Sequence, residues 1–327
     1  MKYDLNTSSR VSDIPILLII WRRPHTLKKL IDALRPSAPK NLFVACDGPR
    51  LNIPVEAEKV AATRSLISSD IDWPCQIHTL YSEVNRGCSI GPIRAISWFF
   101  EQVEEGIVLE DDCIPHVDFF SYCSSLLEYY RHDTRVWCIS GNNFQDGKWR
   151  GDGTYYFSRY THCWGWASWR RCWLHFDPHL KSWPALRESS QLDTIFEDVL
   201  ERRYWSIIWE RTYQHSASVT WWDYQWTYAC LANGGLTIIP NQNLVSNIGF
   251  GDDSSHFTEY ADVRNADQGL DTLLHPQFIV RDSHADIYTF RNHHLAASRR
   301  IAGLLLPRLK AQVLHTWNKI KRSYSHD

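Results

Sequence analysis

The chain has 327 residues and a formal net charge of −2, from 35 basic and 37 acidic side chains. This balance gives no case for nucleic-acid binding through overall charge, and an apolar content of 44% is not that of a disordered chain. Nine cysteines, none of them in a Cys-x-x-Cys pair, argue against a disulfide scaffold or a zinc ribbon.

Neither an export signal nor a membrane span is expected. The first 25 residues lack a basic segment followed by an apolar core and a cleavage site, and the apolar run 14–20 is too short to cross a bilayer. We therefore expect a cytoplasmic protein.

The first half of the chain alternates between apolar runs and segments with helical spacing. Strands are predicted over 14–20, 41–48, 75–82 and 106–110, and helices over 25–34, 54–68 and 91–103. This alternation predicts an α/β fold with a mainly parallel sheet flanked by helices. Ligands of such sheets bind outside the carboxyl ends of the strands.

The second half is less regular and rich in aromatic residues. Strands are predicted over 135–144, 153–160 and the start of 234–251, and helices over 117–131, 165–173, 191–202 and 204–215. Many of the 16 tryptophans lie between Trp137 and Trp226. Their faces suit sugar rings, although core filling is the more common use of aromatic residues.

The tail from Arg291 to Asp327 carries eight basic residues and one acid, with apolar residues at helical spacing. A basic amphipathic helix predicts a membrane-surface element, here on the inner face of the membrane. The alternative is a terminal helix that packs on its own domain, with a kink at Pro307.

Three adjacent acids, Glu110, Asp111 and Asp112, end the apolar strand of residues 106–110. One interpretation is a strand that has surfaced, with solvated acids. The other is a divalent cation, Mn²⁺ or Mg²⁺, which prefers carboxylate oxygens and takes one or two from the protein when phosphates supply the rest. The remaining acids would then accept hydrogen bonds from ribose or sugar hydroxyls.

Two arginines and one further acid also follow predicted strands. Arg23 comes after the first strand, Asp47 ends the second, and Arg86 comes after the third. The planar guanidinium matches the oxygens of a diphosphate, whereas any single loop arginine is more often just solvated. Together with the acids, these residues predict a binding crevice at one edge of the sheet.

Several motifs resemble the N-acetylglucosaminyltransferase I family, and the chain is also similar to bacterial glycosyltransferases found with surface-polysaccharide genes. The matching segments are Glu110-Asp111-Asp112, Asp118-Phe119-Phe120, Trp137-Cys138-Ile139-Ser140, and residues 161–169, 221–226 and 245–251. Their order and approximate spacing agree with the family pattern Glu-Asp-Asp-Leu, Asp-Phe-Phe, Trp-Cys-Val-Ser and Trp-Asp-Asp-Trp. The resemblance covers roughly residues 13–260.

The resemblance implies a GT-A fold, a divalent metal, and a nucleoside-diphosphate sugar as donor, with a UDP-sugar favoured. A glycosyltransferase domain would span 1–290, with a nucleotide-binding half (13–145) and an acceptor half (146–260), followed by the tail 291–327. The reaction would be inverting transfer of a hexosyl or N-acetylhexosaminyl group to a glycan or lipid-linked acceptor in polysaccharide biosynthesis.

The resemblance also distributes roles among residues. Asp112 would bind the metal, Glu110 the ribose, Asp47 the nucleobase and Arg23 the diphosphate, with Asp111 between the metal and the sugar. Two further positions are expected from chemistry alone. Arg86 would reach the diphosphate, and His256 would reach the metal or the diphosphate, although a lone histidine is more often structural.

The predicted general base is Asp223, which stands between Trp222 and Tyr224. Surrounding tryptophans would shield its carboxylate from water and make it a better proton acceptor. The family has two adjacent acids here and this chain has one. The alternative is an acid held by a helix start or an arginine, with Glu210 and Asp111 as reserve candidates.

Two rival functions remain. A sugar nucleotidyltransferase is also an α/β enzyme with acids and metal, but it usually carries a Gly-rich signature after the first strand, and residues 21–29 contain no glycine. A non-catalytic carbohydrate-binding protein would explain the tryptophans but would not need an acid cluster at a strand end.

Overall fold

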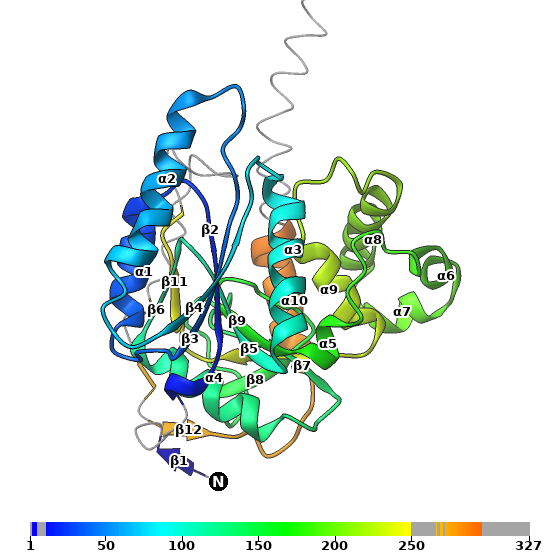
Figure 1. Cartoon of the computed structure of the whole chain (residues 1–327). Helices are drawn as coiled ribbons and strands as arrows, with labels where there is room; N and C mark the ends of the chain where they lie inside the picture. Colours follow the sequence, from blue (N-terminus) through cyan, green and yellow to red (C-terminus); the bar gives the residue numbers. More distant parts are fainter. Residues whose placement is uncertain (1, 5–10, 250–265, 267–268, 271, 296–327) are drawn as a thin grey trace, which may run out of the picture.

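A computed structural model describes residues 2–4, 11–249, 266, 269–270 and 272–295 (Figure 1). Its central sheet contains β2 (Ile16–Ile20), β3 (Asn41–Cys46), β4 (Gln76–Tyr81), β5 (Glu105–Glu110), β7 (Val136–Ser140), β8 (Tyr155–Ser158), β9 (Trp166–Trp169) and β10 (Leu236–Pro240). The strand order is β4-β3-β2-β5-β9-β7-β10-β8. All run parallel except β9 and β8, which are antiparallel to their neighbours. The predicted α/β class and mainly parallel sheet are confirmed.

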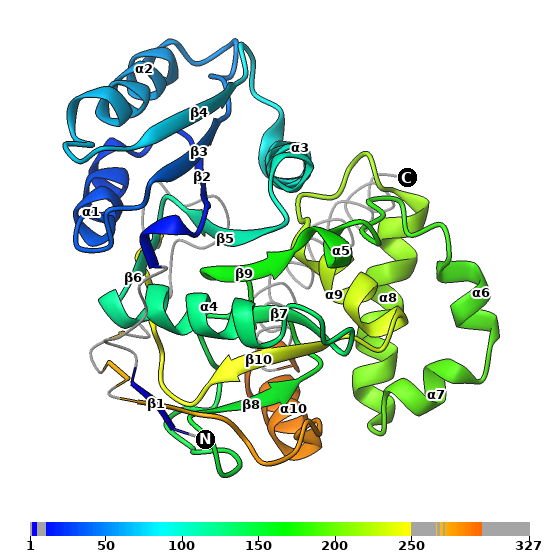
Figure 2. The ribbon, with the colours of Figure 1, turned by 60° about the horizontal axis from the view of Figure 1, so that its bottom comes forward.

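The first four strands of this sheet are joined by crossover helices. These are α1 (Pro24–Leu34), α2 (Pro54–Ser69) and α3 (Gly87–Gln102). The helices α1 and α2 lie on one side of β2 and β3, and α3 lies on the other (Figures 1 and 2). Right-handed crossovers require this, because the chain moves outward from β2 to β4 and then returns across β2 to β5.

The second half of the chain adds one helix, α4, that lies along the sheet, and further helices that lie at the edge of the sheet. The helices are α4 (Val117–Tyr129), α5 (Arg170–Trp173), α6 (Trp183–Glu188), α7 (Gln191–Ile195), α8 (Val199–Gln214), α9 (Asp223–Ala232) and α10 (Ser283–Thr289). Figure 2 shows α6, α7 and α8 projecting away from β2, β3 and β4. Two small sheets pair β6 (Cys113–Pro115) with β11 (Val245–Asn247), and β1 (Lys2–Asp4) with β12 (Thr272–Leu274).

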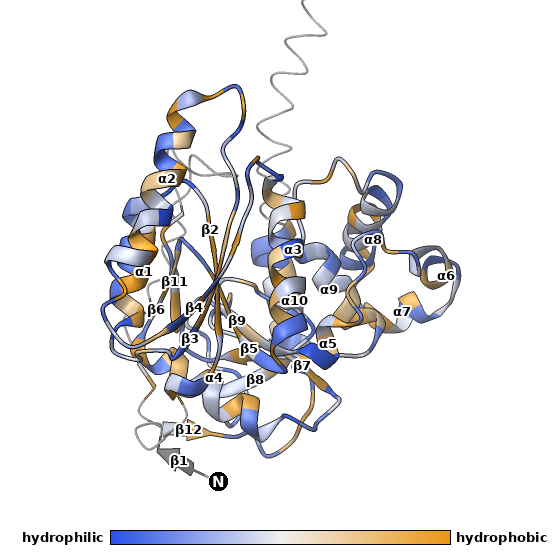
Figure 3. Ribbon diagram, in the orientation of Figure 1, coloured by the Kyte–Doolittle hydropathy of each residue, from blue (hydrophilic) through white to orange (hydrophobic). Residues whose placement is uncertain are grey.

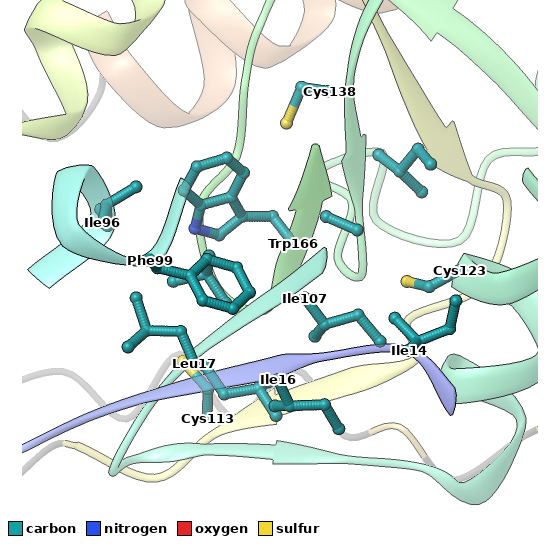
Figure 4. Close-up of a cluster of buried hydrophobic side chains, with 14 of the residues drawn as sticks. Ile14, Ile16, Leu17, Ile96, Phe99, Ile107, Cys113, Cys123, Cys138 and Trp166 are labelled. Carbon is teal, nitrogen blue, oxygen red and sulfur yellow. The ribbon is translucent and has the colours of Figure 1, made fainter. Parts of the chain in front are cut away.

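The main core lies on both faces of the central strands. In Figure 3 hydrophobic colouring follows many of these strands, whereas the outer helices alternate between hydrophobic and hydrophilic residues. Figure 4 shows Trp166 of β9 beside Phe99 of α3 and Ile107 of β5, and all three side chains are buried. Burying such a side chain contributes about 1.5–3 kcal/mol. The fully buried tryptophans are therefore core residues.

A buried ionic network connects the helical group to the sheet. Arg159, which follows β8, donates to Glu201 of α8 at 2.6 Å and lies 3.7 Å from the carboxylate of Asp286 in α10. Tyr160 also donates to Glu201, and Ser158 donates to Asp286. All three members of the charged set are almost fully buried, so removing one would leave part of the charge of the others without compensation in a medium of low polarity.

The structure corrects several predicted elements. The predicted helix 165–173 forms only over Arg170–Trp173, because Trp166–Trp169 is the buried strand β9, which pairs with both β5 and β7. The break that was predicted between helices 191–202 and 204–215 lies earlier, at residues 196–198. There Asp198 caps α8 by accepting from the N–H of Leu200. The strand β11 lies where a loop was expected.

Within the described ranges, no helix is long and apolar enough to cross a bilayer. All nine cysteines are free. The helix α10 continues as a π-helical turn over Phe290–His294. The rest of the predicted tail, from residue 296 onward, lies outside the described residues, so the predicted membrane contact stays a prediction, as do the domain bounds.

Glu201 should make the stability of the chain depend on pH. Burial raises the pKa of Glu201 from 4.5 to about 7, against the opposing effects of Arg159 and Tyr160. The folded state therefore holds a proton that the unfolded state releases, so this contribution is full below about pH 4.5 and is lost as the pH rises toward 7. Across this window the wild type should lose on the order of 3 kcal/mol relative to Glu201→Gln.

Urea unfolding at several pH values measures this difference. The control is Glu58→Gln, on the exposed face of α2. Parallel pH profiles for wild type and Glu201→Gln would contradict the assignment.

Candidate functional site

The order of the strands reverses between β2 and β5. The strands β3 and β4 lie on one side of β2, and β5 lies on the other. Ligands of open α/β sheets bind at such a reversal, outside the carboxyl ends of the strands. Ile19 pairs with Glu110 in the sheet, so residues 21–23 after β2 and the acids after β5 emerge side by side.

A cavity of about 350 Å³ opens at this edge of the sheet. Its charged wall residues are Arg22, Arg23, Arg50, Arg94, Asp47, Glu110 and Asp111. Four of the predicted site residues thus come together here, although Asp47 and Glu110 are far apart in the sequence. The volume is at the lower end of the range for small-molecule sites.

Arg23 joins two of the three adjacent acids. Its Nη1 donates to Asp112 Oδ2 at 2.8 Å and its Nη2 donates to Asp111 Oδ1. Although burial opposes the charge, the two carboxylates raise the pKa of Arg23, and burial raises the pKa of Asp111 against the effect of Arg23. Asp111 and Asp112 are therefore not simply solvated, because each is paired with Arg23.

Asp47 holds the start of α3 in place. Its carboxylate accepts from the backbone N–H groups of Arg86 and Gly87 at 2.8 and 3.0 Å, and from Asn85 Nδ2 at 3.0 Å. Burial raises the pKa of Asp47, while these backbone hydrogen bonds oppose the shift. Asp47 thus fixes the loop between β4 and α3, and its predicted contact with a nucleobase stays a prediction.

A second group of contacts builds the wall around Trp21. The guanidinium of Arg22 lies 4.5 Å from the centre of the indole, and that of Arg50 lies 5.5 Å from it. The fully buried Glu56 accepts from Arg22 at 2.8 Å and from the backbone N–H of Arg50 at 3.0 Å. The hydrogen bond from Arg50 is the main reason that the pKa of Glu56 is lowered, so this acid is a fixed negative anchor.

Glu110 differs from its two neighbours in having no hydrogen-bond partner for its carboxylate among the described residues. Burial, followed by the charge of Asp112, raises the pKa of Glu110 to about 8, and Arg23 opposes this shift. The charge of Asp223 also contributes to the increase. The end of β5 and the start of α9 therefore lie close enough for their carboxylates to repel.

Asp223 is the first residue of α9. Its role as a base and its role as an acid held by the helix start both stay predictions. The segment before it is fixed from two sides. Ser89 of α3 donates to the carbonyl of Trp221 at 3.0 Å, and Trp221 Nε1 donates to Thr212 of α8 at 3.1 Å. These bonds hold the start of α9 beside α3.

The acids do not fit a divalent cation as they are arranged. Asp112 Oδ2 accepts from Arg23, and the backbone of Gly249 packs directly against the Asp112 carboxylate. Both oxygens of Asp111 accept hydrogen bonds, from Arg23 and from the N–H of Trp21 at 3.0 Å. Among the described residues, no three His, Cys, Asp or Glu side chains are placed to hold a metal ion. The metal-ligand predictions for Asp112 and His256 therefore rest on the sequence alone, and His256 lies outside the described residues.

Two further candidates lie elsewhere. The side chain of Arg86 is exposed and does not line the cavity, although its backbone N–H binds Asp47. Glu210 lies in a separate groove between α6 and α8, where Trp183 and Arg187 donate to it. Glu210 therefore does not line the cavity at the β2–β5 reversal.

Sequence reasoning missed several residues of the cavity wall. Trp21 and Arg22 directly follow the first strand, and Arg50 follows the Asp-Gly pair that ends the second. These residues follow predicted strands, which is the same sequence signal that predicts Arg23 as a site residue. Arg94 lies inside α3, and only the packing of that helix places it in the wall.

No protein-family model and no curated protein sequence matches the chain. Similar solved structures include HddC from Yersinia pseudotuberculosis, at 9% identity and a TM-score of 0.32, covering 49% of this chain and 78% of that one. A UDP-glucose pyrophosphorylase complexed with UDP-glucose is 7% identical with a TM-score of 0.29, covering 50% and 78%. The 4-diphosphocytidyl-2C-methyl-D-erythritol synthase from Anaerococcus prevotii DSM 20548 is 12% identical with a TM-score of 0.30, covering 56% and 84%. Similarity at this level assigns no activity to this chain.

Gly48 should be essential for the shape of the cavity. A Cβ at this position would lie 2.5 Å from the backbone N and C of Val84, so Gly48→Ala must push two loops apart. We expect a loss of about 1–3 kcal/mol in the free energy of unfolding, measured by urea denaturation. The matched control is Gly91→Ala in α3, whose Cβ would come no closer than 3.6 Å to the carboxylate of Asp47 and should be tolerated. Equal stabilities for the two variants would contradict this prediction.

Proposed function

We propose that this chain is a transferase that binds a nucleoside-diphosphate sugar in the cavity at the β2–β5 reversal. The observation that carries this proposal is the composition of the cavity wall. It contains four arginines together with Glu110, whose carboxylate has no hydrogen-bond partner among the described residues. Guanidinium groups match phosphate oxygens, and a carboxylate accepts hydrogen bonds from ribose or sugar hydroxyls.

The positive charge available to a diphosphate comes mainly from three of the arginines. Arg22 and Arg50 share the single carboxylate of Glu56, and Arg94 donates only to the hydroxyl of Ser82 at 2.9 Å in the described chain. Arg23 is already paired with Asp111 and Asp112, so its role is to hold the acids. A UDP-sugar remains the favoured ligand on the resemblance to the N-acetylglucosaminyltransferase I family.

For the reaction we propose inverting glycosyl transfer, with Asp223 as the general base. The acceptor hydroxyl would attack the anomeric carbon as the bond to the diphosphate breaks, and its proton would pass to the carboxylate. The effect of Asp223 on Glu110 supports this role, because the charge of Asp223 contributes to the raised pKa of that wall residue. A glycan or lipid-linked acceptor and a place in polysaccharide biosynthesis extend the same proposal.

A second candidate is nucleotidyl transfer between a nucleoside triphosphate and a sugar phosphate. The arginine-rich wall suits a triphosphate as well as a diphosphate. The absence of glycine from residues 21–29, which follow β2, counts against this candidate.

A non-catalytic carbohydrate-binding protein is disfavoured. Trp166, Trp183, Trp205, Trp209 and Trp226 are fully buried, so they fill the core and present no face to a sugar.

Nucleotide binding is the first test of the proposal. A nucleoside diphosphate at 100 times its dissociation constant should add about 2.7 kcal/mol of apparent stability. UDP, GDP and dTDP should be compared by thermal unfolding, with Arg94→Gln as the variant that loses part of the shift. No shift with any of them would contradict the proposed ligand class. Product analysis then separates the two reactions, because nucleotidyl transfer releases pyrophosphate and glycosyl transfer releases the nucleoside diphosphate.

Asp223→Asn should separate binding from chemistry. Loss of a general base lowers transfer by about 10²–10⁴-fold while nucleotide affinity stays near that of the wild type. Glu210→Gln serves as the control, because Glu210 lies in another groove and should leave transfer unchanged. Normal transfer by Asp223→Asn would remove this acid from the mechanism, and weakened nucleotide binding would move it to the donor site.

A further inference from the structure

We propose that the guanidinium of Arg23 takes the position that a divalent cation would occupy between Asp111 and Asp112, and that the cavity binds nucleoside diphosphate without such a cation. The ligand class rests on the proposed function. The position of Arg23 rests on its contacts alone and can be tested separately.

The carboxylate oxygens beside Arg23 are already in use. Asp111 Oδ1 and Asp112 Oδ2 accept from the two terminal nitrogens of Arg23, and Asp111 Oδ2 accepts from the N–H of Trp21 at 3.0 Å. Asp112 Oδ1 lies 3.7 Å from the thiol of Cys113, which donates to it. A cation that bridged Asp111 Oδ1 and Asp112 Oδ2 would therefore have to displace the guanidinium.

Arg23 is held at this place by a rigid element. It is the residue before α1, and its carbonyl accepts from Leu27 N–H at 3.1 Å and from Thr26 Oγ1 at 3.0 Å. Pro24 fixes the first helical position, and the apolar face of α1 is buried against the core. The backbone that carries this guanidinium therefore belongs to the fixed start of α1 and does not move with a loop.

Displacing the guanidinium would also be costly. The side chain of Arg23 is only 14% exposed and that of Asp111 only 2%. Breaking a buried ion pair leaves both charges without compensation in a medium of low polarity, which is strongly destabilising. The binding free energy of a cation would have to offset both the loss of ion pairs by the guanidinium and the dehydration of the cation itself.

The charge of a diphosphate can be met without a metal. Arg94 is the arginine of the wall that pairs with no acid among the described residues, and Arg22 and Arg50 together face one acid, Glu56. These three arginines can therefore offer guanidinium groups to phosphate oxygens.

The first experiment uses the wild-type chain. UDP, GDP and dTDP are titrated by calorimetry, once in EDTA and once with excess Mn²⁺. We expect the dissociation constant of the best ligand to change by less than about tenfold, or 1.4 kcal/mol, between the two buffers. Binding that appears only with Mn²⁺ would overturn the inference. If no nucleotide binds in either buffer, the proposed function fails, and the next experiment still decides the position of Arg23.

The second experiment titrates Mn²⁺ alone and follows free Mn²⁺ by electron paramagnetic resonance. Arg23→Gln frees two carboxylates and should bind Mn²⁺ at least about tenfold more tightly than the wild type. The control is Arg35→Gln, which removes the same charge from the other end of α1, where Arg35 pairs with Asp32 and Asp72, and should behave as the wild type.

Two further variants keep the test decisive if Arg23→Gln does not fold. Arg23→Lys retains one positive charge and should exclude Mn²⁺ as the wild type does. Asp112→Asn should leave Mn²⁺ binding by the free chain unchanged, because the wild type binds none there. Mn²⁺ binding by the wild type that disappears in Asp112→Asn would overturn the inference, as would equal affinity in Arg23→Gln and the wild type.

Discussion

The ion pairs between Arg23 and the acids after β5 set the arrangement of the candidate site. A buried strand delivers three carboxylates at one point, and their mutual repulsion requires a positive charge nearby. The reversal of strand order supplies it, because it makes β2 the neighbour of β5 and brings residues 21–23 beside the acids. The position of α1 and the course of the chain after β5 are both consistent with this requirement.

The other elements position the walls around this ion-pair cluster. Asp47 fixes the entry to α3, Glu56 fixes the loop that carries Arg50, and Ser89 fixes the segment before α9. Each of these polar side chains binds backbone groups of a neighbouring loop. The cavity is therefore shaped by a few side chains that act as loop anchors, while the apolar core behind them keeps the strands in register.

The first half of the fold could be predicted from the sequence because each element carried its own signal. Apolar runs such as residues 14–20 and helical spacing such as that of residues 25–34 depend only on local pattern, and the strand-end rule located Arg23, Asp47 and Glu110. The failures came where tertiary contacts override local pattern. Trp166–Trp169 forms a strand only because it pairs with two neighbouring strands, β5 and β7. The pairing of Arg23 with both acids needed a three-dimensional arrangement that no spacing in the sequence reveals.

The insertion of β9 between β5 and β7 also has a consequence for the order of events during synthesis. When β5 leaves the ribosome, β2 can cover one of its edges, but the other edge stays open until β9 has been made. An uncovered edge of an apolar strand is a site for pairing with other chains, and non-local pairing of this kind is slow. Nascent chains that stop between β5 and β9 should therefore be the ones that need a chaperone most.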